Sequence, residues 1–296
     1  MNEFNGKMKA CICYLTWNRW AYTKYSLQSI IDNTDRSLYE LILWDNGSTE
    51  PGMVDWIRDI CLTNNFKYLF FKRNEGLTRA MNNQMKTMNM MDNFDVFCHI
   101  SNDIVVPPNW LSGVFEAVNT KKVGVVGLKM NEEFNTILET VKIDGVELEK
   151  IKFEGNVGGM HFCIPKFVYD ILGGFKHVKF GYGQQDANYC LQVKLLPMDI
   201  WDYYLPLNKY RGDDLSISMP IYSEYQNKRN VRLKRSGSDA DAGRNYREQL
   251  KQIRKKYDNK QISKDQLINM LRDNDKFLDL DKSQLLETNI KEFKND

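Results

Sequence analysis

The 296-residue sequence lacks several features that would place it in a specialised class of protein. No run of apolar residues approaches the roughly 20 that a helix needs to cross a bilayer. The polar start, residues 1–9, has no apolar core of the kind that a secretory signal contains. We find no internal repeat and no low-complexity segment. These absences predict an intracellular, cytoplasmic protein, and the hydrophobic fraction of 42% is ordinary for a globular chain with a real core.

Cysteine and histidine are too few and too scattered to predict a dedicated metal site. The six cysteines include no CxxC pair, and most of them lie in apolar runs. Cys11 and Cys13 would share one face of a strand, but two ligands without a second pair make a poor zinc site. His99 also lies within an apolar run, which favours a core residue over a ligand. We therefore expect buried free thiols.

The net charge of +2 conceals an uneven distribution along the chain. Residues 227–256 contain eleven Lys or Arg against three Asp or Glu, a surplus of eight positive charges, so the remaining residues carry −6. A basic stretch of this kind often meets phosphate, on nucleic acid or on an anionic membrane. It could equally be a solvated linker and helix. The sequence leaves these alternatives open for residues 228–256.

Apolar runs alternate with segments of helical spacing over the first 128 residues. Five runs predict buried strands, at residues 8–15, 39–45, 67–72, 96–101 and 123–128. The intervening segments predict helices, at residues 21–32, 53–62, 77–91 and 109–119. Continuous apolar strands separated by helices imply an α/β fold with a mostly parallel, Rossmann-like sheet. Ligands of such sheets bind beyond the carboxyl ends of the strands.

The second half of the chain changes character. Residues 131–204, with a helix near 184–195, are expected to extend the sheet and to form the second wall of a cleft. After Ser216 the periodic strands stop, and a basic helix is expected over residues 244–257. Ser263 and Gln266 form a capping-box pattern that opens a helix ending at Arg272, and a third helix is expected over 283–293. We therefore divide the chain into an α/β domain, 1–225, and a basic linker with a helical C-terminal extension, 226–296.

Polar motifs follow three of the predicted strands. These motifs are Thr16-Trp17-Asn18-Arg19, Asp45-Asn46-Gly47-Ser48-Thr49, and Ser101-Asn102-Asp103 with Pro108-Asn109-Trp110-Leu111 beyond it. In this order, the set resembles the family 2 glycosyltransferases of the GT-A fold, over roughly residues 8–215. The resemblance implies a nucleotide-sugar donor, with a UDP-sugar as the first guess.

A nucleotide diphosphate concentrates negative charge, and a divalent cation with hard oxygen ligands suits it. Asp103 is placed to supply one carboxylate oxygen to Mn²⁺ or Mg²⁺, and the ion would neutralise charge on the leaving diphosphate. The resemblance assigns the nucleobase to Asp45 and brings Arg79 near the diphosphate or sugar. The predicted donor-binding residues are Thr16, Asn18, Arg19, Asp45, Asn46, Gly76, Arg79 and Asn102. From the residues alone, Asp45 could simply make an Asx turn, and Arg79 could be a solvated helix residue.

The second half supplies a candidate base. Gln185-Asp186 resembles the E-D pair that opens a helix in the family, with Gln185 in place of the Glu, and Asp186 matches its catalytic aspartate. Inversion at the anomeric carbon needs one base to take the proton of the acceptor hydroxyl. The residues predicted on the acceptor side are Gly159, Gly174, Phe175 and Gln185. A carboxylate at a helix start also suits the helix dipole, which is the alternative explanation of Asp186.

The sequence departs from the family pattern at the residues expected to bind the metal ion. Ile104 and Val105 stand where a second Asp would complete a D-x-D pattern, and residues 208–216 contain no His. The ion would then have one protein ligand unless Asp213 or Asp214 substitutes, and Lys209 or Arg211 could contact phosphate instead.

Two other classes of protein stay open, and so does the acceptor. One class is a non-catalytic module that binds a nucleotide sugar or a glycan on a transferase scaffold. The other is a nucleotidyltransferase, although Thr16-Trp17-Asn18-Arg19 lacks the glycine-rich loop with a lysine that such an enzyme typically has after strand one. The expected acceptor is either a glycan or a hydroxylated base in DNA, as in bacteriophage DNA modification.

Overall fold

The computed structural model describes residues 8–128, 137–143, 145–151, 157–159, 161–176, 185–205, 237–272 and 280–293. Within these residues, ten strands form one mixed sheet in the order β10-β3-β2-β1-β4-β8-β5-β9-β7-β6. The strands are β1 (Ala10–Thr16), β2 (Tyr39–Asp45), β3 (Lys67–Phe71), β4 (Val96–Ser101), β5 (Val123–Leu128), β6 (Ile137–Ile143), β7 (Val146–Ile151), β8 (His161–Pro165), β9 (Trp201–Leu205) and β10 (Leu285–Thr288). Strands β3, β2, β1 and β4 run parallel to one another, and β8 is antiparallel to β4 and β5.

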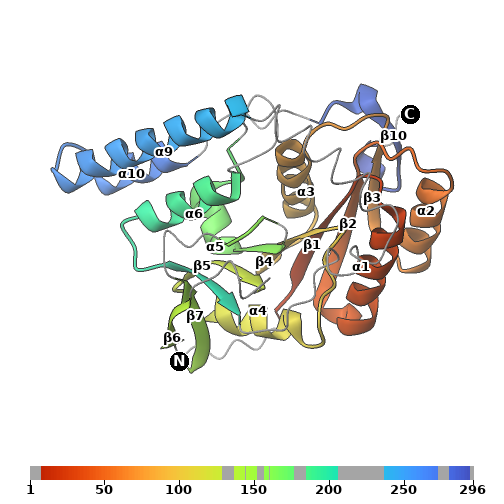
Figure 1. Ribbon diagram of the computed structural model, residues 1–296, viewed down its shortest axis with the longest axis horizontal. Coiled ribbons are helices and arrows are strands. Elements are labelled where there is room, and N and C mark those ends of the chain that lie inside the picture. The colour runs from red at the N-terminus through yellow and green to blue at the C-terminus, as the bar shows by residue number, and fades with distance from the viewer. Residues whose placement is uncertain are drawn as a thin grey trace.

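Helices cover both faces of the sheet (Figure 1). They are α1 (Trp20–Asn33), α2 (Met53–Thr63), α3 (Leu77–Met91), α4 (Trp110–Asn119), α5 (Lys166–Leu172), α6 (Gln185–Leu195), α9 (Gly237–Asp258) and α10 (Lys264–Leu271). Helices α1, α2 and α4 share one apolar core with the sheet, and α3, α5 and α6 share the other. Helices α9 and α10 pack against α6 and α5. No described helix is both long and apolar enough to span a membrane.

The two cores follow from the alternation of side chains along each strand. In β1, Ile12 and Tyr14 pack in the core with α1 and α4, whereas Cys11 and Cys13 pack in the core with α3. Because successive side chains of a strand point to opposite faces, a strand covered on both sides must be apolar throughout. All six cysteines are buried free thiols, which confirms that prediction. His99 is also a core residue: burial lowers its pKa to about 3, and His161 contributes to this shift.

The predicted elements are found with shifts of one or two residues at their ends, with two exceptions: α9 begins at Gly237 rather than at residue 244, and the last described segment has another structure. The capping box of α10 is present, because Ser263 Oγ accepts from Gln266 N and Ser263 N donates to Gln266 Oε1 at 2.8 Å. The helix predicted over 283–293 is wrong. That segment forms the strand β10 between two short 3-10 helices, Lys282–Gln284 and Lys291–Phe293.

Strand β10 forms because its backbone pairs with the edge strand β3. It runs antiparallel to β3, and the Glu287 carboxylate accepts from the guanidinium of Arg58, with Nε–Oε1 at 2.8 Å, and from the Tyr68 hydroxyl. Asn289 extends the pairing, since its side chain accepts from Tyr68 N and donates to Phe66 O. The end of the described chain is therefore an integral part of the sheet. The domain boundary predicted at residue 225 lies outside the described residues.

Candidate functional site

The carboxyl ends of β1 and β2 are joined through a buried carboxylate. Thr16 Oγ1 donates to Asp45 Oδ1 at 2.8 Å, and the backbone N–H and hydroxyl of Ser48 also donate to Asp45. Asp45 is 1% exposed, and burial raises the pKa of its carboxyl while the bonds from Ser48 and Thr16 oppose that shift. Asp45 thus makes the turn that its position before Asn-Gly suggested. The backbone N–H of Gly47 also lowers the pKa of this carboxyl, so groups of the turn and Thr16 approach all of its roughly four acceptor sites.

The loop between β1 and α1 is held in a conformation that costs energy. Asn18 and Arg19 have φ values of 52° and 64°, and such left-handed conformations cost about 1–2 kcal/mol for residues other than glycine. Residues of the turn after β2 hold Asn18 and Arg19 in this conformation through hydrogen bonds. Thr49 N donates to Asn18 Oδ1 at 2.7 Å. The Glu50 carboxylate accepts from Arg19 N at 2.7 Å and Trp20 N at 2.9 Å. Sequence reasoning assigned no role to Glu50.

This strained loop aims the side chain of Arg19 at Asp103. Arg19 Nη1 lies 2.7 Å from Asp103 Oδ2, and the two side chains are 11% and 9% exposed. Asp103 Oδ1 is buried and accepts no hydrogen bond from any described residue. Asn102, beside it, donates to Asn18 O and to Thr23 Oγ1, both at 2.9 Å. The amide N–H₂ of Asn102 is therefore occupied in joining the end of β4 to the Arg19 loop.

Asp103 fits the role of a lone metal ligand. Its Oδ1 is a hard carboxylate oxygen without a partner, which is the type of atom that Mn²⁺ and Mg²⁺ bind. Elsewhere in the described part of the chain, no three His, Cys, Asp or Glu side chains gather as a metal site. Among the described residues, Asp103 is thus the candidate ligand that this edge offers to an ion. Lys209, Arg211, Asp213 and Asp214 lie outside the described residues.

The loop between β3 and α3 forms another side of the site. Asn46 donates to Asn74 Oδ1 at 3.0 Å and accepts from Glu75 N at 2.8 Å, so the ends of β2 and β3 are joined. The side chain of Glu75 is 3% exposed and pairs with both Arg73 and Arg79. Arg79 keeps its Nε–H buried without a partner among the described residues. Gly76 directly precedes α3. Its φ is 92°, a positive value that glycine adopts more readily than other residues.

Asp186 lies in the first turn of α6 and is fixed by two backbone groups. Gly159 N donates to its Oδ2 at 2.9 Å, and Ala187 N donates to its Oδ1 at 2.8 Å. A Cβ on Gly159 would lie 3.3 Å from Asp186 Oδ2, a tight contact that would require the carboxylate to shift by a few tenths of an ångström. The structure therefore brings together two residues that were predicted separately.

The topology places Asp186 at the same edge of the sheet as Asp103. Strand β8 is antiparallel to β4, with His161 opposite Ile100. The residues just before β8 therefore lie at the carboxyl end of β4. Gly159 is two residues before His161 and holds Asp186, while Asp103 is two residues beyond the end of β4. The candidate base and the candidate metal ligand thus share one edge.

Phe175, predicted on the acceptor side, has its side chain in the core. Its ring is 2% exposed and packs on Phe162 and Tyr189, so it is a core side chain. Its backbone is held by Asn82, whose side chain donates to Phe175 O and accepts from Phe175 N, both at 2.8 Å. Asn82 had no predicted role. Gly174 and Gln185 are also buried. Of the four predicted acceptor-side residues, only Gly159 directly contacts Asp186 in a described hydrogen bond.

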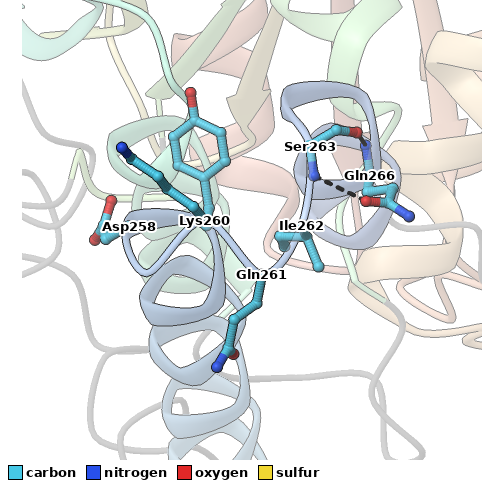
Figure 2. A pocket seen from close by; sticks show the side chains of 7 residues that line it. Asp258, Lys260, Gln261, Ile262, Ser263 and Gln266 are labelled. Carbon is cyan, nitrogen blue, oxygen red and sulfur yellow. Dashed lines mark hydrogen bonds between the residues drawn. The ribbon is translucent and has the colours of Figure 1, made fainter.

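One described hollow is unrelated to this edge. It has a volume of about 610 Å³ and lies at the turn between α9 and α10 (Figure 2). Two of its polar lining residues, Ser263 and Gln266, already form hydrogen bonds with each other. It contains none of the strand-end residues.

The strand order and the strand-end site together define a GT-A-type glycosyltransferase fold. The model of Glycosyl transferase family 2 matches residues 11–165, just over half of the chain. The chain therefore belongs to Glycosyl transferase family 2. No curated protein matches it.

Solved structures of low sequence identity share the fold. The mannosyltransferase PcManGT from Pyrobaculum calidifontis, in complex with GDP-Man and Mn²⁺, is 13% identical with a TM-score of 0.51, over 69% of this chain and 59% of that one. TarS 1-349 from S. aureus is 15% identical with a TM-score of 0.51, over the same two shares. GalNAc-T7 with UDP, GalNAc and Mn²⁺ is 12% identical with a TM-score of 0.52, over 68% and 43%. The chain thus spans about three-fifths or less of these proteins.

Proposed function

We propose that the chain is an inverting glycosyltransferase that moves a sugar from a nucleotide-sugar donor to an acceptor hydroxyl, with Asp186 as the base. Membership of Glycosyl transferase family 2 supports the reaction class. The observation that carries the assignment is the Gly159–Asp186 bond, because it fixes a carboxylate at the edge of the sheet where Asp103 stands. A base and a group that neutralises diphosphate must both be near the donor sugar.

The donor would lie across the ends of β1, β2 and β4. Asp45, held by Thr16 and Ser48, would accept one ring N–H of a nucleobase in place of one of its bonds within the turn. Arg79, with an unpartnered Nε–H on the first turn of α3, would donate to the diphosphate or the sugar. A UDP-sugar is our first choice of donor, and TarS has been solved with UDP-GlcNAc.

Asp103 would hold Mn²⁺ or Mg²⁺ through Oδ1, and the ion would supply charge neutralisation for the leaving diphosphate. Arg19 adds a permanent positive charge at the same place, since its guanidinium contacts the other oxygen of Asp103. Two of the structural neighbours were solved with Mn²⁺, which supports this choice of ion.

Transfer would proceed by a single displacement. Asp186 takes the proton of the acceptor hydroxyl while that oxygen forms a bond to the anomeric carbon. The bond from the anomeric carbon to the phosphate oxygen breaks on the opposite side, and its electron pair leaves with the nucleoside diphosphate. The anomeric configuration is therefore inverted. The backbone N–H groups of Gly159 and Ala187 hold the two carboxylate oxygens in place for this step.

The acceptor is either a glycan or a hydroxylated base in DNA, and cytoplasmic localisation stays a prediction. The family match gives no support to a nucleotidyltransferase. A non-catalytic module that binds a nucleotide sugar is the remaining alternative. It is favoured by the Arg19–Asp103 ion pair, because that pair engages one oxygen of the proposed metal ligand.

A donor screen tests the proposal directly. Thermal shift and release of free nucleotide are measured with UDP-, GDP-, CMP- and dTDP-sugars, each with and without Mn²⁺. We expect one donor to stabilise the protein, a further gain with Mn²⁺ that Asp103→Asn removes, and slow nucleotide release. Stabilisation without release over long incubation would indicate the binding module. Failure of every donor to stabilise the protein would overturn the donor site.

A further inference from the structure

The side chain of Asn82, on helix α3, binds both backbone groups of a residue far away in the chain. Its Nδ2 donates to Phe175 O and its Oδ1 accepts from Phe175 N, both at 2.8 Å. Asn82 is 5% exposed and Phe175 is 2% exposed. A buried backbone group that lost its partner would pay the cost of desolvation, so each of the two bonds matters. This pair of bonds, the Asn82 clamp, therefore fixes Phe175 to α3.

Helix α3 is anchored to the sheet independently of the Asn82 clamp. Gln84 Nε2 donates to Tyr14 O and to Ile42 O, both at 2.9 Å. These two carbonyls belong to β1 and β2, the strands whose ends form the proposed donor site. Loss of the clamp should therefore leave α3 in place, with Arg79 on its first turn, and release Phe175 instead.

The ring of Phe175 packs between the two elements that hold Asp186. Its centroid lies 5.2 Å from that of Phe162 in β8 and 5.1 Å from that of Tyr189 in α6. Asp186 stands on α6, three residues before Tyr189. Its carboxylate accepts from Gly159 N, two residues before β8 begins. The ring of Phe175 therefore helps to set the spacing of β8 and α6 at the place where Asp186 is held.

The turn that precedes Phe175 is also fixed from α6. Tyr189 Oη donates to Gly173 O at 3.0 Å, and Tyr189 is fully buried. The segment from Gly173 to Phe175 is thus held by α6 at its first residue and by α3 at its last. Both helices pack in the core on one face of the sheet (Figure 1). The segment therefore connects the helix that carries Arg79 to the helix that carries Asp186.

We propose that Asn82 is a positioning residue for Asp186, and that it acts through Phe175 to place the base relative to the donor. The proposal rests on the proposed role of Asp186 in the transferase. A misplacement of about 1 Å by a change far from the chemistry can cost about 10²-fold in rate. Since Gln84 keeps α3 on the donor side, loss of the clamp should lower kcat and leave the KM for the donor almost unchanged.

Asn289 supplies a matched control, because it makes the same two kinds of bond elsewhere. Its side chain accepts from Tyr68 N at 2.9 Å and donates to Phe66 O at 2.8 Å, directly after β10. Asn82→Ala and Asn289→Ala therefore each remove one bond to a backbone N–H and one to a backbone C=O. Only Asn82→Ala removes them at Phe175.

The kinetic test measures nucleotide release from the preferred sugar donor with Mn²⁺. We expect Asn82→Ala to lower kcat about tenfold or more with KM within about twofold, and Asn289→Ala to change both by less than about twofold. A general loss of stability would affect the two variants alike. Equal falls in kcat, an unchanged kcat in Asn82→Ala, or a rise in its KM alone would overturn the proposal.

Amide hydrogen exchange reports on the position of the base without any donor. Gly159 N–H is bonded to Asp186, and Tyr68 N–H is bonded to Asn289. We expect Asn82→Ala to speed exchange at Gly159 at least about threefold and to leave Tyr68 unchanged, and Asn289→Ala to do the reverse. Unchanged exchange at Gly159 in Asn82→Ala would contradict the positioning role.

A second pair of variants decides the question if Asn82→Ala does not fold. Tyr189→Phe removes only the hydroxyl that bonds to Gly173 O, and its control is Tyr68→Phe, which loses a hydroxyl bond to Glu287 at 2.8 Å. We expect Tyr189→Phe to lower kcat about threefold and to speed the same exchange, and Tyr68→Phe to do neither. Tyr189→Phe with the kcat and the exchange of the unmodified protein would overturn the proposal.

The two readouts separate this inference from the proposed function. Nucleotide release by the unmodified protein, with no effect of Asn82→Ala on kcat or on exchange, would remove the positioning role alone. Faster exchange at Gly159 in Asn82→Ala, in a protein that releases no nucleotide from any donor, would support the positioning of Asp186 by Asn82 and remove the transferase.

Discussion

Arg19 Nη1 lies 2.7 Å from Asp103 Oδ2, so the proposed metal ligand already has a cationic partner within the protein. The Arg19 guanidinium also lies over the ring of Tyr22, at 4.4 Å from its centroid. The turn after β2 sets this geometry, because Glu50 holds the backbone of Arg19. The carboxylate of Asp103 therefore has one oxygen engaged by a cation and the other, Oδ1, without a described partner.

This ion pair predicts competition between Arg19 and a metal ion. Arg19→Gln removes a positive charge beside Asp103 and releases Oδ2. We expect Mn²⁺ affinity without nucleotide to rise roughly tenfold, since a unit charge at about 4 Å is worth about 1–4 kcal/mol depending on the effective dielectric. Electron paramagnetic resonance of free Mn²⁺ measures this affinity. Arg272→Gln at an exposed position is the matched control, and Asp103→Asn should abolish the site. Unchanged or weaker binding in Arg19→Gln would refute the competition.

The turn after β2 should not tolerate a side chain at Gly47. A Cβ there would lie 2.6 Å from the backbone of Arg73, and φ is +75°. Gly145 has a φ of +90° with nothing within 4 Å of a new Cβ, which makes Gly145→Ala the matched control. We expect Gly145→Ala to cost about 1 kcal/mol of unfolding free energy through backbone strain alone. Gly47→Ala should cost about 1–3 kcal/mol more, through the added overlap. Urea unfolding of the two variants measures the difference, and equal costs would contradict the close approach.

The C-terminal strand should make stability depend on pH. Arg58 holds the pKa of the Glu287 carboxyl below its ordinary value near 4.5, and Tyr68 contributes. A lowered pKa stabilises the folded chain fully above that ordinary value, and the gain is lost as pH falls from there through the lower pKa of the folded state. The unmodified protein should therefore lose more unfolding free energy between pH 6 and pH 3 than Glu287→Gln does.

Glu292→Gln is the control for this pH effect, because Glu292 is an exposed carboxylate close by in the chain. Urea unfolding at both pH values gives the comparison. If Glu287→Gln and the unmodified protein lost the same free energy, the Arg58–Glu287 pair would not contribute to the pH dependence.

The strands and the residues at their ends were predictable because their signals are local. Apolar runs such as Val96–Ser101 mark buried strands, and the polar residues that follow must lie at the carboxyl edge. The order of these motifs was enough to place Asp45 and Asp103 at one edge. The helical boundaries followed from turn and capping residues such as Ser263 and Gln266.

The features that sequence reasoning missed depend on residues far apart in the chain. Leu286, Ile290 and Phe293 have helical spacing, yet pairing with β3 and the Arg58–Glu287 contact make the segment a strand. Glu50 and Asn82 act by bonding backbone groups of other segments, at Arg19 and Phe175. No local pattern identifies those partners. The same holds for the Gly159–Asp186 bond, which only the position of β8 beside β4 explains.

The central claim is that Asp186 is the base of a transferase, and one kinetic comparison tests it most directly. Release of nucleotide from the preferred sugar donor with Mn²⁺ is measured for the unmodified protein, for Asp186→Asn and for the exposed control Asp199→Asn, with donor affinity measured for each. We predict that Asp186→Asn lowers the rate by about 10²–10⁴-fold with donor affinity within about threefold, and that Asp199→Asn changes neither. A rate for Asp186→Asn equal to that of the unmodified protein would contradict the account.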